Sequence, residues 1–190
     1  MNFHTNHRLL VGFSFFGYLA LTYLIAIGPA YRVQDTPGLP GAPTRSDSAE
    51  RGRDLYLAEG CGFCHTQFVR DLPLDRPYGR GSVAEDYAFE NPPLLGTQRT
   101  GPDLSNVAQR QPSDVWHLIH LYNPRSVVPL SVMPSYTWYF EVKGSASSDD
   151  VVVRLPDAFA PPPGKIVVAK QEALDLVAYL LSLRQVEVGL

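Results

Sequence analysis

The sequence has few cysteines, few methionines and little charge, and these shortages exclude several classes of protein. Two cysteines among 190 residues cannot form the disulfide framework of a small secreted domain. A formal net charge of −3 lacks the strong basic excess that is typical of nucleic-acid-binding proteins. Apolar residues make up 45 % of the chain, which is too many for a disordered or fibrous protein. We therefore expect a folded domain without a nucleic-acid partner.

One long apolar segment lies near the N-terminus. Residues Leu9–Ile27 form an uncharged run, and a helix of that length covers roughly 28 Å, close to the hydrocarbon thickness of a bilayer. A cleavable signal peptide is the alternative, but its apolar stretch is usually only about 7–15 residues long. Pro29 and Tyr31 also make a poor processing site. We expect residues 1–31 to be a transmembrane anchor.

The charges beside this segment indicate its orientation. Arg8, the free amino terminus, His4 and His7 precede the segment, whereas Arg32 and then Asp35 follow it, so the positive-inside rule favours a cytoplasmic N-terminus. We expect a single-pass protein of a bacterial inner membrane, with the rest of the chain on the periplasmic side. Residues 32–47 are rich in proline and glycine and are predicted to form a linker. Residues 48–190 are predicted to form one domain.

Helical periodicity predicts a mainly α domain with long loops. Helices are expected over 48–59 and 113–122, each with its first serine as the N-cap, and over 171–184. The β-branched runs 151–155 and 165–169 are predicted to form a small hairpin. The remaining segments are predicted to be mostly turns and loops.

Both cysteines lie in the pentapeptide CGFCH, which runs from Cys61 to His65 and matches the C-x-x-C-H attachment motif of c-type haem. With this spacing, two thiols can form thioethers with the vinyl groups on one edge of a porphyrin. The adjacent histidine then lies at the iron as an axial ligand. We expect Cys61 and Cys64 to hold one covalent haem and His65 to bind its iron.

Three other functions compete for the cysteine pair. A thioredoxin-like redox site needs a preceding strand in a βαβ unit, whereas a helix is predicted before Cys61. A zinc site would need His117 and His120 as its other ligands. A disulfide across so short a loop is unfavourable. The haem is favoured because the motif, the anchor and the preceding helix agree.

The second axial ligand is predicted by elimination. The chain has two methionines, and Met1 belongs to the membrane end, which leaves Met133. A thioether ligand favours reduced iron and raises the reduction potential relative to a second histidine. A buried core methionine is the alternative for Met133, and His117 and His120 are the rival ligands.

Three further residues are candidates for contact with the haem or its ligand. The carbonyl oxygen of Pro102 is a candidate acceptor for the second ring nitrogen of His65, which would fix the imidazole, although a Gly-Pro pair is also a simple turn. Arg99 and Arg125 are candidates to neutralise haem propionates, because guanidinium matches carboxylate geometry. Solvated surface arginine is the alternative for both.

A series of short motifs resembles the class I cytochromes c. The motifs are Gly52-x-x-Leu55-Tyr56, the C-x-x-C-H pentapeptide, Gly101-Pro102, Met133-Pro134 and Ala178-Tyr179-Leu180. In that family the first and last helices cross, and the haem sits in the loops between them. The resemblance implies that the predicted first and last helices of this domain pack together, with Gly52 allowing their close approach.

The middle of the chain is similar to the monohaem subunit of cbb-type cytochrome c oxidases, the FixO/CcoO family. The matching segments, between Gly52 and Trp138, are Tyr78-Gly79-x-x-Ser82-Val83-Ala84, Arg99-Thr100-Gly101-Pro102-Asp103-Leu104, Trp116-His117, His120-Leu121-Tyr122-Asn123-Pro124-Arg125, Val127-Val128-Pro129 and Met133-Pro134-Ser135-Tyr136. The resemblance implies an anchored electron carrier of aerobic respiration, packed against a catalytic haem–copper subunit and other membrane subunits. Its electrons would come from a donor cytochrome or a quinol-oxidising complex.

Two departures leave the partner complex open. Residues 130–132, which precede Met133, lack the family's Glu/Asn-rich pattern, and residues 141–170 have no evident counterpart. A nitric oxide reductase-like complex with a small cytochrome c subunit, or a free-standing anchored shuttle, are the alternatives. Six-coordinate His/Met ligation would leave no position for oxygen, so we expect this chain to carry electrons while a partner performs catalysis. Loops as long as residues 66–99 are commonly functional, and we expect this one to contact the large subunit.

Overall fold

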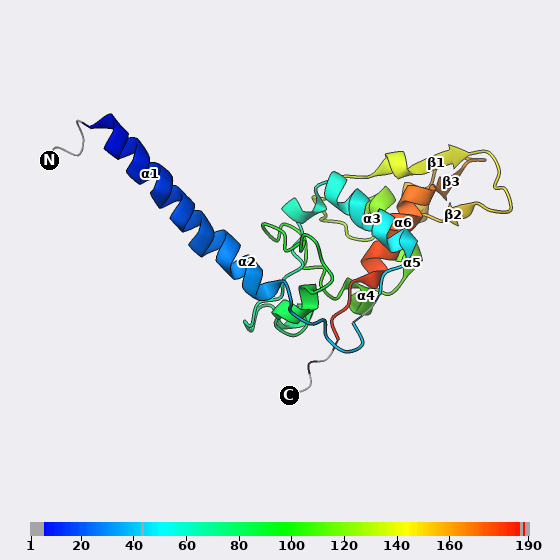
Figure 1. Cartoon of the computed structure of the whole chain (residues 1–190). Coiled ribbons are helices and arrows are strands. Elements are labelled where there is room, and N and C mark those ends of the chain that lie inside the picture. The colour runs from blue at the N-terminus through cyan, green and yellow to red at the C-terminus, as the bar shows by residue number, and fades with distance from the viewer. Residues whose placement is uncertain (1–5, 43, 187, 189–190) are drawn as a thin grey trace. The chain divides into compact units, whose positions relative to one another are not determined.

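The computed structural model describes residues 6–42, 44–186 and 188 (Figure 1). Predictions that concern residues 1–5, including the start of the anchor and Met1, lie outside this part of the chain. The chain divides into two compact units, which are described separately. One comprises the residues up to 39 together with 83–89, and the other comprises 40–82 and the residues from 90 onward.

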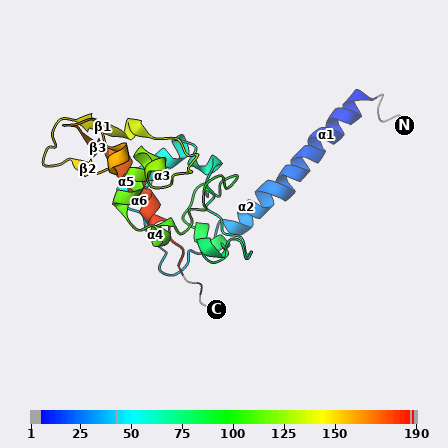
Figure 2. The same cartoon turned by 180° about the vertical axis from the view of Figure 1, so that it is seen from behind.

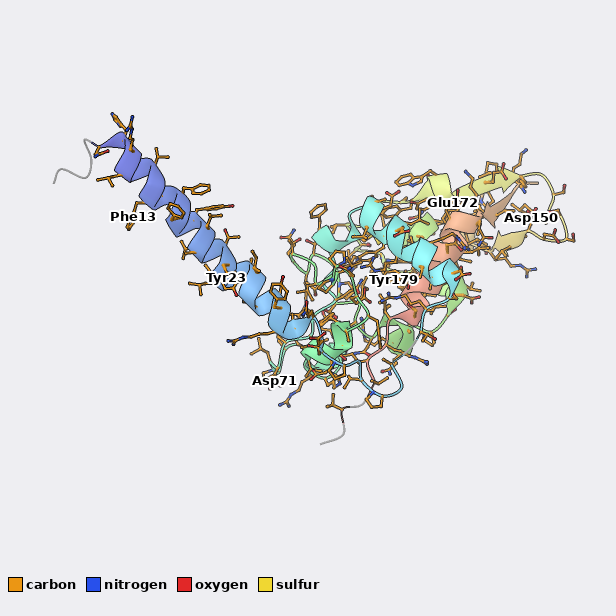
Figure 3. All side chains as sticks on the ribbon, viewed as in Figure 1. Phe13, Tyr23, Asp71, Asp150, Glu172 and Tyr179 are labelled. Carbon is orange, nitrogen blue, oxygen red and sulfur yellow. The ribbon has the colours of Figure 1, made fainter. Side chains whose placement is uncertain are left out.

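The N-terminal unit is dominated by one long helix. Helix α1 (His7–Thr22) continues through a π-helical turn (Tyr23–Ile27) into α2 (Gly28–Val33). At 27 residues it is long and apolar enough to cross a membrane, and none of these described residues is buried. Figure 3 shows Phe13 and Tyr23 projecting from it. One apolar helix with an exposed surface supports membrane anchoring, and it ends at Val33, two residues beyond the predicted end of the anchor.

The π-helical turn has a local cause in the sequence. The amide of Gly28 donates to the carbonyl of Tyr23, five residues earlier, where an α-helix would use the fourth. Pro29 follows directly and has no amide hydrogen for the helix ladder. Helix irregularities commonly occur beside a proline, because its missing amide hydrogen interrupts the regular hydrogen bonds of the helix.

Two helices from opposite ends of the sequence form the centre of the second unit. Helix α3 (Asp47–Ala58) packs against α6 (Gln171–Ser182), as both ribbon views show (Figures 1 and 2). Gly52 makes this approach possible, because a Cβ atom there would overlap the carbonyl of Asp175 and the Cβ of Tyr179. The ring of Tyr56 meets that of Tyr179 edge-on, with their centroids 5.3 Å apart.

The predicted N-cap of the first helix is wrong by two residues. The cap is Ser46, whose hydroxyl accepts a hydrogen bond from the amide of Ala49 at 3.2 Å. Ser48 instead donates to the carboxylate of Asp175 at 2.6 Å, and Arg51 pairs with the same carboxylate at 2.7 Å. These contacts lower the pKa of Asp175 to about 2, chiefly through Arg51. Ser48, which local spacing favours as the cap, therefore binds a residue distant in the sequence, Asp175, and Ser46 caps the helix.

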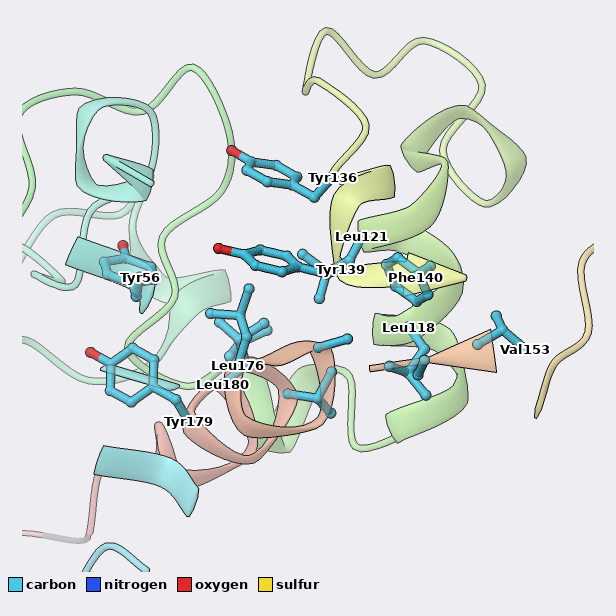
Figure 4. Close-up of a cluster of buried hydrophobic side chains, with 14 of the residues drawn as sticks. Tyr56, Leu118, Leu121, Tyr136, Tyr139, Phe140, Val153, Leu176, Tyr179 and Leu180 are labelled. Atoms are coloured by element: carbon cyan, nitrogen blue, oxygen red, sulfur yellow. The ribbon is translucent and has the colours of Figure 1, made fainter. Parts of the chain in front are cut away.

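A small antiparallel sheet completes the unit. Its strands, β1 (Phe140–Lys143), β2 (Val151–Val153) and β3 (Ile166–Ala169), have the order β1-β3-β2. The predicted hairpin is present as β2–β3, with Val151 opposite Ala169, whereas β1 is an unpredicted third strand. Figure 4 shows Phe140 and Val153 beside Leu118 of α5 (Asp114–Tyr122), so the sheet joins the helical core. Helix α5 begins at its predicted cap, Ser113, and α4 (Val107–Arg110) is a single turn.

We predict that Gly52→Ala destabilises this unit by about 1–3 kcal/mol, because the added methyl group has no space at the α3–α6 crossing. Urea unfolding of the full chain in detergent measures the change. Gly144→Ala is the matched control, since a Cβ there meets no atom within 4 Å and the expected change is within about 0.5 kcal/mol. Equal stability of the two variants would contradict the close packing.

Candidate haem site

The pentapeptide forms a tight turn at the end of α3. Gly60 adopts a left-handed conformation (φ +68°), which ends the helix at little steric cost. A 3₁₀ turn over Cys61–Phe63 follows, and the amides of Cys64 and His65 both donate to the carbonyl of Cys61. The turn thereby places two thiols and an imidazole within five consecutive residues.

The two thiols of the turn are free and have different surroundings. Cys61 packs against the core cluster, and burial raises its pKa to about 11. Cys64 is exposed. Neither thiol forms a disulfide. Among residues 6–42, 44–186 and 188, no group of three or more His, Cys, Asp and Glu side chains is arranged to hold a metal ion, so the zinc alternative gains no support.

The imidazole of His65 is held from one side. Its Nδ1 lies 2.8 Å from the carbonyl oxygen of Pro102, which accepts a hydrogen bond from that nitrogen and leaves Nε2 available as a metal ligand. Burial lowers the pKa of His65, which favours the neutral ring that iron ligation needs. Gly101 lies against the ring, because a Cβ there would overlap its atoms.

The donor set fits a covalently attached haem. Two free thiols at the required spacing stand beside an imidazole whose non-ligating nitrogen already has an acceptor. The structure describes where these groups lie, and their haem roles stay predictions.

Met133 lies in the loop between Pro124 and the 3₁₀ turn Thr137–Tyr139. Its side chain is partly buried and packs against the core cluster, and its amide donates to the hydroxyl of Ser131 at 3.2 Å. The same cluster includes the partly buried Cys61. Its role as an iron ligand stays a prediction.

The two histidines of α5 have different environments. His117 is buried, and its Nε2 donates to the carbonyl of Gln111 at 2.8 Å, which accounts for it as a structural residue. The ring of His120 stacks on Trp116 with centroids 4.6 Å apart. Burial lowers the pKa of His120 to about 4, and its buried Nδ1 has no hydrogen-bond partner among the described residues.

Arg99 and Arg125 have different surroundings. The guanidinium of Arg99 donates to the Thr66 hydroxyl at 2.6 Å, to Asp75 at 2.6 Å and to the carbonyl of Phe68 at 2.5 Å. These partners lie within the described residues, and the role of Arg99 as a propionate partner stays a prediction. Arg125 is exposed and forms no ion pair with another described residue, so its role as a propionate partner stays a prediction.

A buried charge cluster was not foreseen from the sequence. Asp75 is fully buried between Arg70 and Arg99, which hold its pKa far below the usual range. Asp103 is also fully buried and accepts hydrogen bonds from Thr66 and from the amide of Phe68. No sequence signal links Asp75 to Arg99, because the loop between them has no periodicity.

An apolar cleft of about 400 Å³ adjoins the pentapeptide turn. Its lining residues carry no charge, and they are Tyr56, Leu57, Gly60, Gly62, Phe63, Pro93, Leu94, Leu95, Gly96 and Thr97. Three of its apolar side chains are strongly exposed: Leu57, Phe63 and Leu95.

The comparison with known families decides which family the chain belongs to. A family model described as cytochrome c oxidase, mono-heme subunit/FixO, matches residues 5–162. The chain belongs to this family. The FixO resemblance drawn from the sequence is therefore confirmed, and the match extends to residue 162, into the stretch for which we expected no counterpart. No curated protein matches the chain.

Family membership makes the chain a mono-haem subunit of the cytochrome c oxidase type. The matched residues of this FixO protein include the apolar helix, the pentapeptide, Pro102 and Met133. One haem and an electron-transfer role in such a complex follow at the level of the family. The family match does not specify the covalent linkage, the ligands of the iron or the partner subunit.

We predict that Gly101→Ala lowers haem content by about tenfold or more, because its methyl group would displace the imidazole of His65. The haem content of the full chain purified from membranes measures the effect. Pro102→Ala is the matched control, since it keeps the carbonyl that accepts from Nδ1, and it should retain most of the haem. Native haem content in Gly101→Ala would contradict the tight contact with the ring.

Proposed function

We propose that this chain is a membrane-anchored c-type cytochrome that relays single electrons to the catalytic haem–copper subunit of a cbb-type oxidase. The observation that carries the proposal is the C-x-x-C-H turn, with its free thiols and with His65 bonded to Pro102, in a chain of the FixO family. When bound, a haem supplies a reversible one-electron centre at its iron.

Each residue of the site has a separate role in this proposal. Cys61 and Cys64 hold the cofactor covalently. The covalent links prevent the haem from dissociating outside the cytoplasm. His65 presents Nε2 to the iron while Pro102 fixes the ring and raises its basicity. Met133 would be the second protein ligand of the iron, and a thioether favours the reduced state. With both axial positions taken, the chain passes electrons on, and oxygen chemistry belongs to its partner.

The N-terminal helix gives the proposal its location. We infer that His7–Val33 crosses the inner membrane of a bacterium once, with the cytochrome domain on the periplasmic side. This orientation rests on His7 and Arg8 before the apolar core, against Arg32 with the nearby Asp35 after it. Anchoring keeps the domain next to membrane partners, where electron transfer does not depend on a fresh diffusional encounter.

We predict that the full chain gives a c-type pyridine haemochrome spectrum and that Met133→Ala abolishes its sulfur-to-iron charge-transfer band. The reason is that only the thioether of Met133 provides this transition. Cys64→Ser should weaken covalent attachment, because it removes one of the two thiols that form thioethers, and it leaves the side chain of His65 in place. A colourless native protein would contradict the function, and a charge-transfer band that persists in Met133→Ala would exclude this ligand alone.

The apolar cleft supports a fixed subunit over a mobile shuttle. Transient redox partners use complementary charges to steer their encounters, whereas permanent interfaces bury apolar residues. The cleft beside the pentapeptide turn has an uncharged lining with exposed Leu57 and Leu95 at its rim. We infer that a stably associated subunit covers it.

We predict that the double substitution Leu57→Glu with Leu95→Glu reduces co-purification of the catalytic subunit several-fold in mild detergent, because two charges would be buried at the interface. Haem content should be unchanged. Val142→Glu, at a comparably exposed position of β1, is the control. A native chain that separates from all partners on solubilisation would favour the shuttle. The metals of the co-purified subunit distinguish an oxidase from a nitric oxide reductase-like complex.

A further inference from the structure

A hydrogen bond between two side chains joins the two segments that hold His65. Thr66 follows the histidine, and Asp103 follows Pro102. The hydroxyl of Thr66 donates to Oδ2 of Asp103 at 2.6 Å, and the carbonyl of Thr66 accepts from the amide of Leu104 at 2.8 Å. These bonds clamp the segments together one residue beyond the contact between His65 and Pro102.

The carboxylate of Asp103 cannot rotate in its site. It is fully buried, and both of its oxygens accept from fixed donors. Oδ2 accepts from the amide of Phe68 at 2.9 Å as well as from Thr66, and Oδ1 accepts from the amide of Ser105 at 2.9 Å. Because two of these donors are main-chain amides, the side chain fixes the backbone on both sides of the clamp.

The Thr66 hydroxyl is fixed from a second direction. It accepts from Nε of Arg99 at 2.6 Å while it donates to Asp103. Arg99 in turn donates to the buried Asp75, whose carboxylate also accepts from Arg70. The clamp therefore belongs to a network around the two buried carboxylates of Asp75 and Asp103 in which each charge has a partner, and such networks resist displacement.

We propose that Asp103 and Thr66 are positioning residues for the axial histidine and that they set the reduction potential of the haem through the His65–Pro102 hydrogen bond. The inference rests on the proposed function, because it needs an iron ligated by His65. A firmly held carbonyl acceptor strengthens the donation from Nδ1, makes the imidazole a more basic ligand and favours oxidised iron. Loosening the clamp should therefore raise the potential.

The test compares Thr66→Val, Thr66→Ser and Ser105→Ala in the full chain in detergent. Redox titration gives the midpoint potential, and NMR of the reduced protein gives the solvent-exchange rate of the His65 Nδ1 proton. Thr66→Val should raise the potential and accelerate exchange, since it lacks the clamping hydroxyl. Thr66→Ser should restore native values on both readouts. Ser105→Ala should match the native protein, because its hydroxyl has no partner among the described residues and its amide remains.

A haem-loaded Thr66→Val protein with native potential and native exchange would overturn the proposal, and so would a Thr66→Ser protein that behaves like Thr66→Val. If Thr66→Val does not fold, Arg99→Lys replaces it, because that variant loses the Nε contact with Thr66 but keeps the charge beside Asp75. The same two readouts then decide. A native chain without a haemochrome spectrum would instead overturn the proposed function, which keeps the two failures distinguishable.

Discussion

The pairing of residues 62–67, which include most of the pentapeptide, with residues 95–104 is the contact on which the candidate site depends. Four main-chain hydrogen bonds join them: Thr97 to Gly62, Gln67 to Leu95, Gly101 to Cys64 and Leu104 to Thr66. These bonds bring the Pro102 carbonyl to His65 and leave room for its ring only because residue 101 has no side chain. The turn alone would present an imidazole free to rotate, and the second segment gives it one orientation.

Much of the site could be predicted because its chemistry is local. A C-x-x-C-H pentapeptide carries its own geometry, and a proximal histidine needs an acceptor, so Pro102 follows as a candidate from the sequence alone. The helices 113–122 and 171–184 follow from periodicity over many residues, and their observed starts agree with the prediction, although α6 ends at Ser182, two residues early.

The remaining features depend on partners distant in sequence. Ser46 and Ser48 are equivalent as caps by local criteria, and the carboxylate of Asp175 decides between them. The contacts of the Arg99 guanidinium with Asp75 and Thr66 were not foreseen, because these residues lie 24 and 33 positions away. Strand β1 is four residues long and gains its stability from pairing with β3, so its sequence alone gives little signal.

The α3–α6 crossing has a consequence for the order in which the unit folds. The core around Tyr56 includes Leu176 and Tyr179, which follow it by 120 and 123 residues in the sequence. Contacts between such distant segments form late, because loop closure must precede them. The two thiols therefore stand on an open chain until α6 docks, and the tertiary fold packs around Cys61 only afterwards.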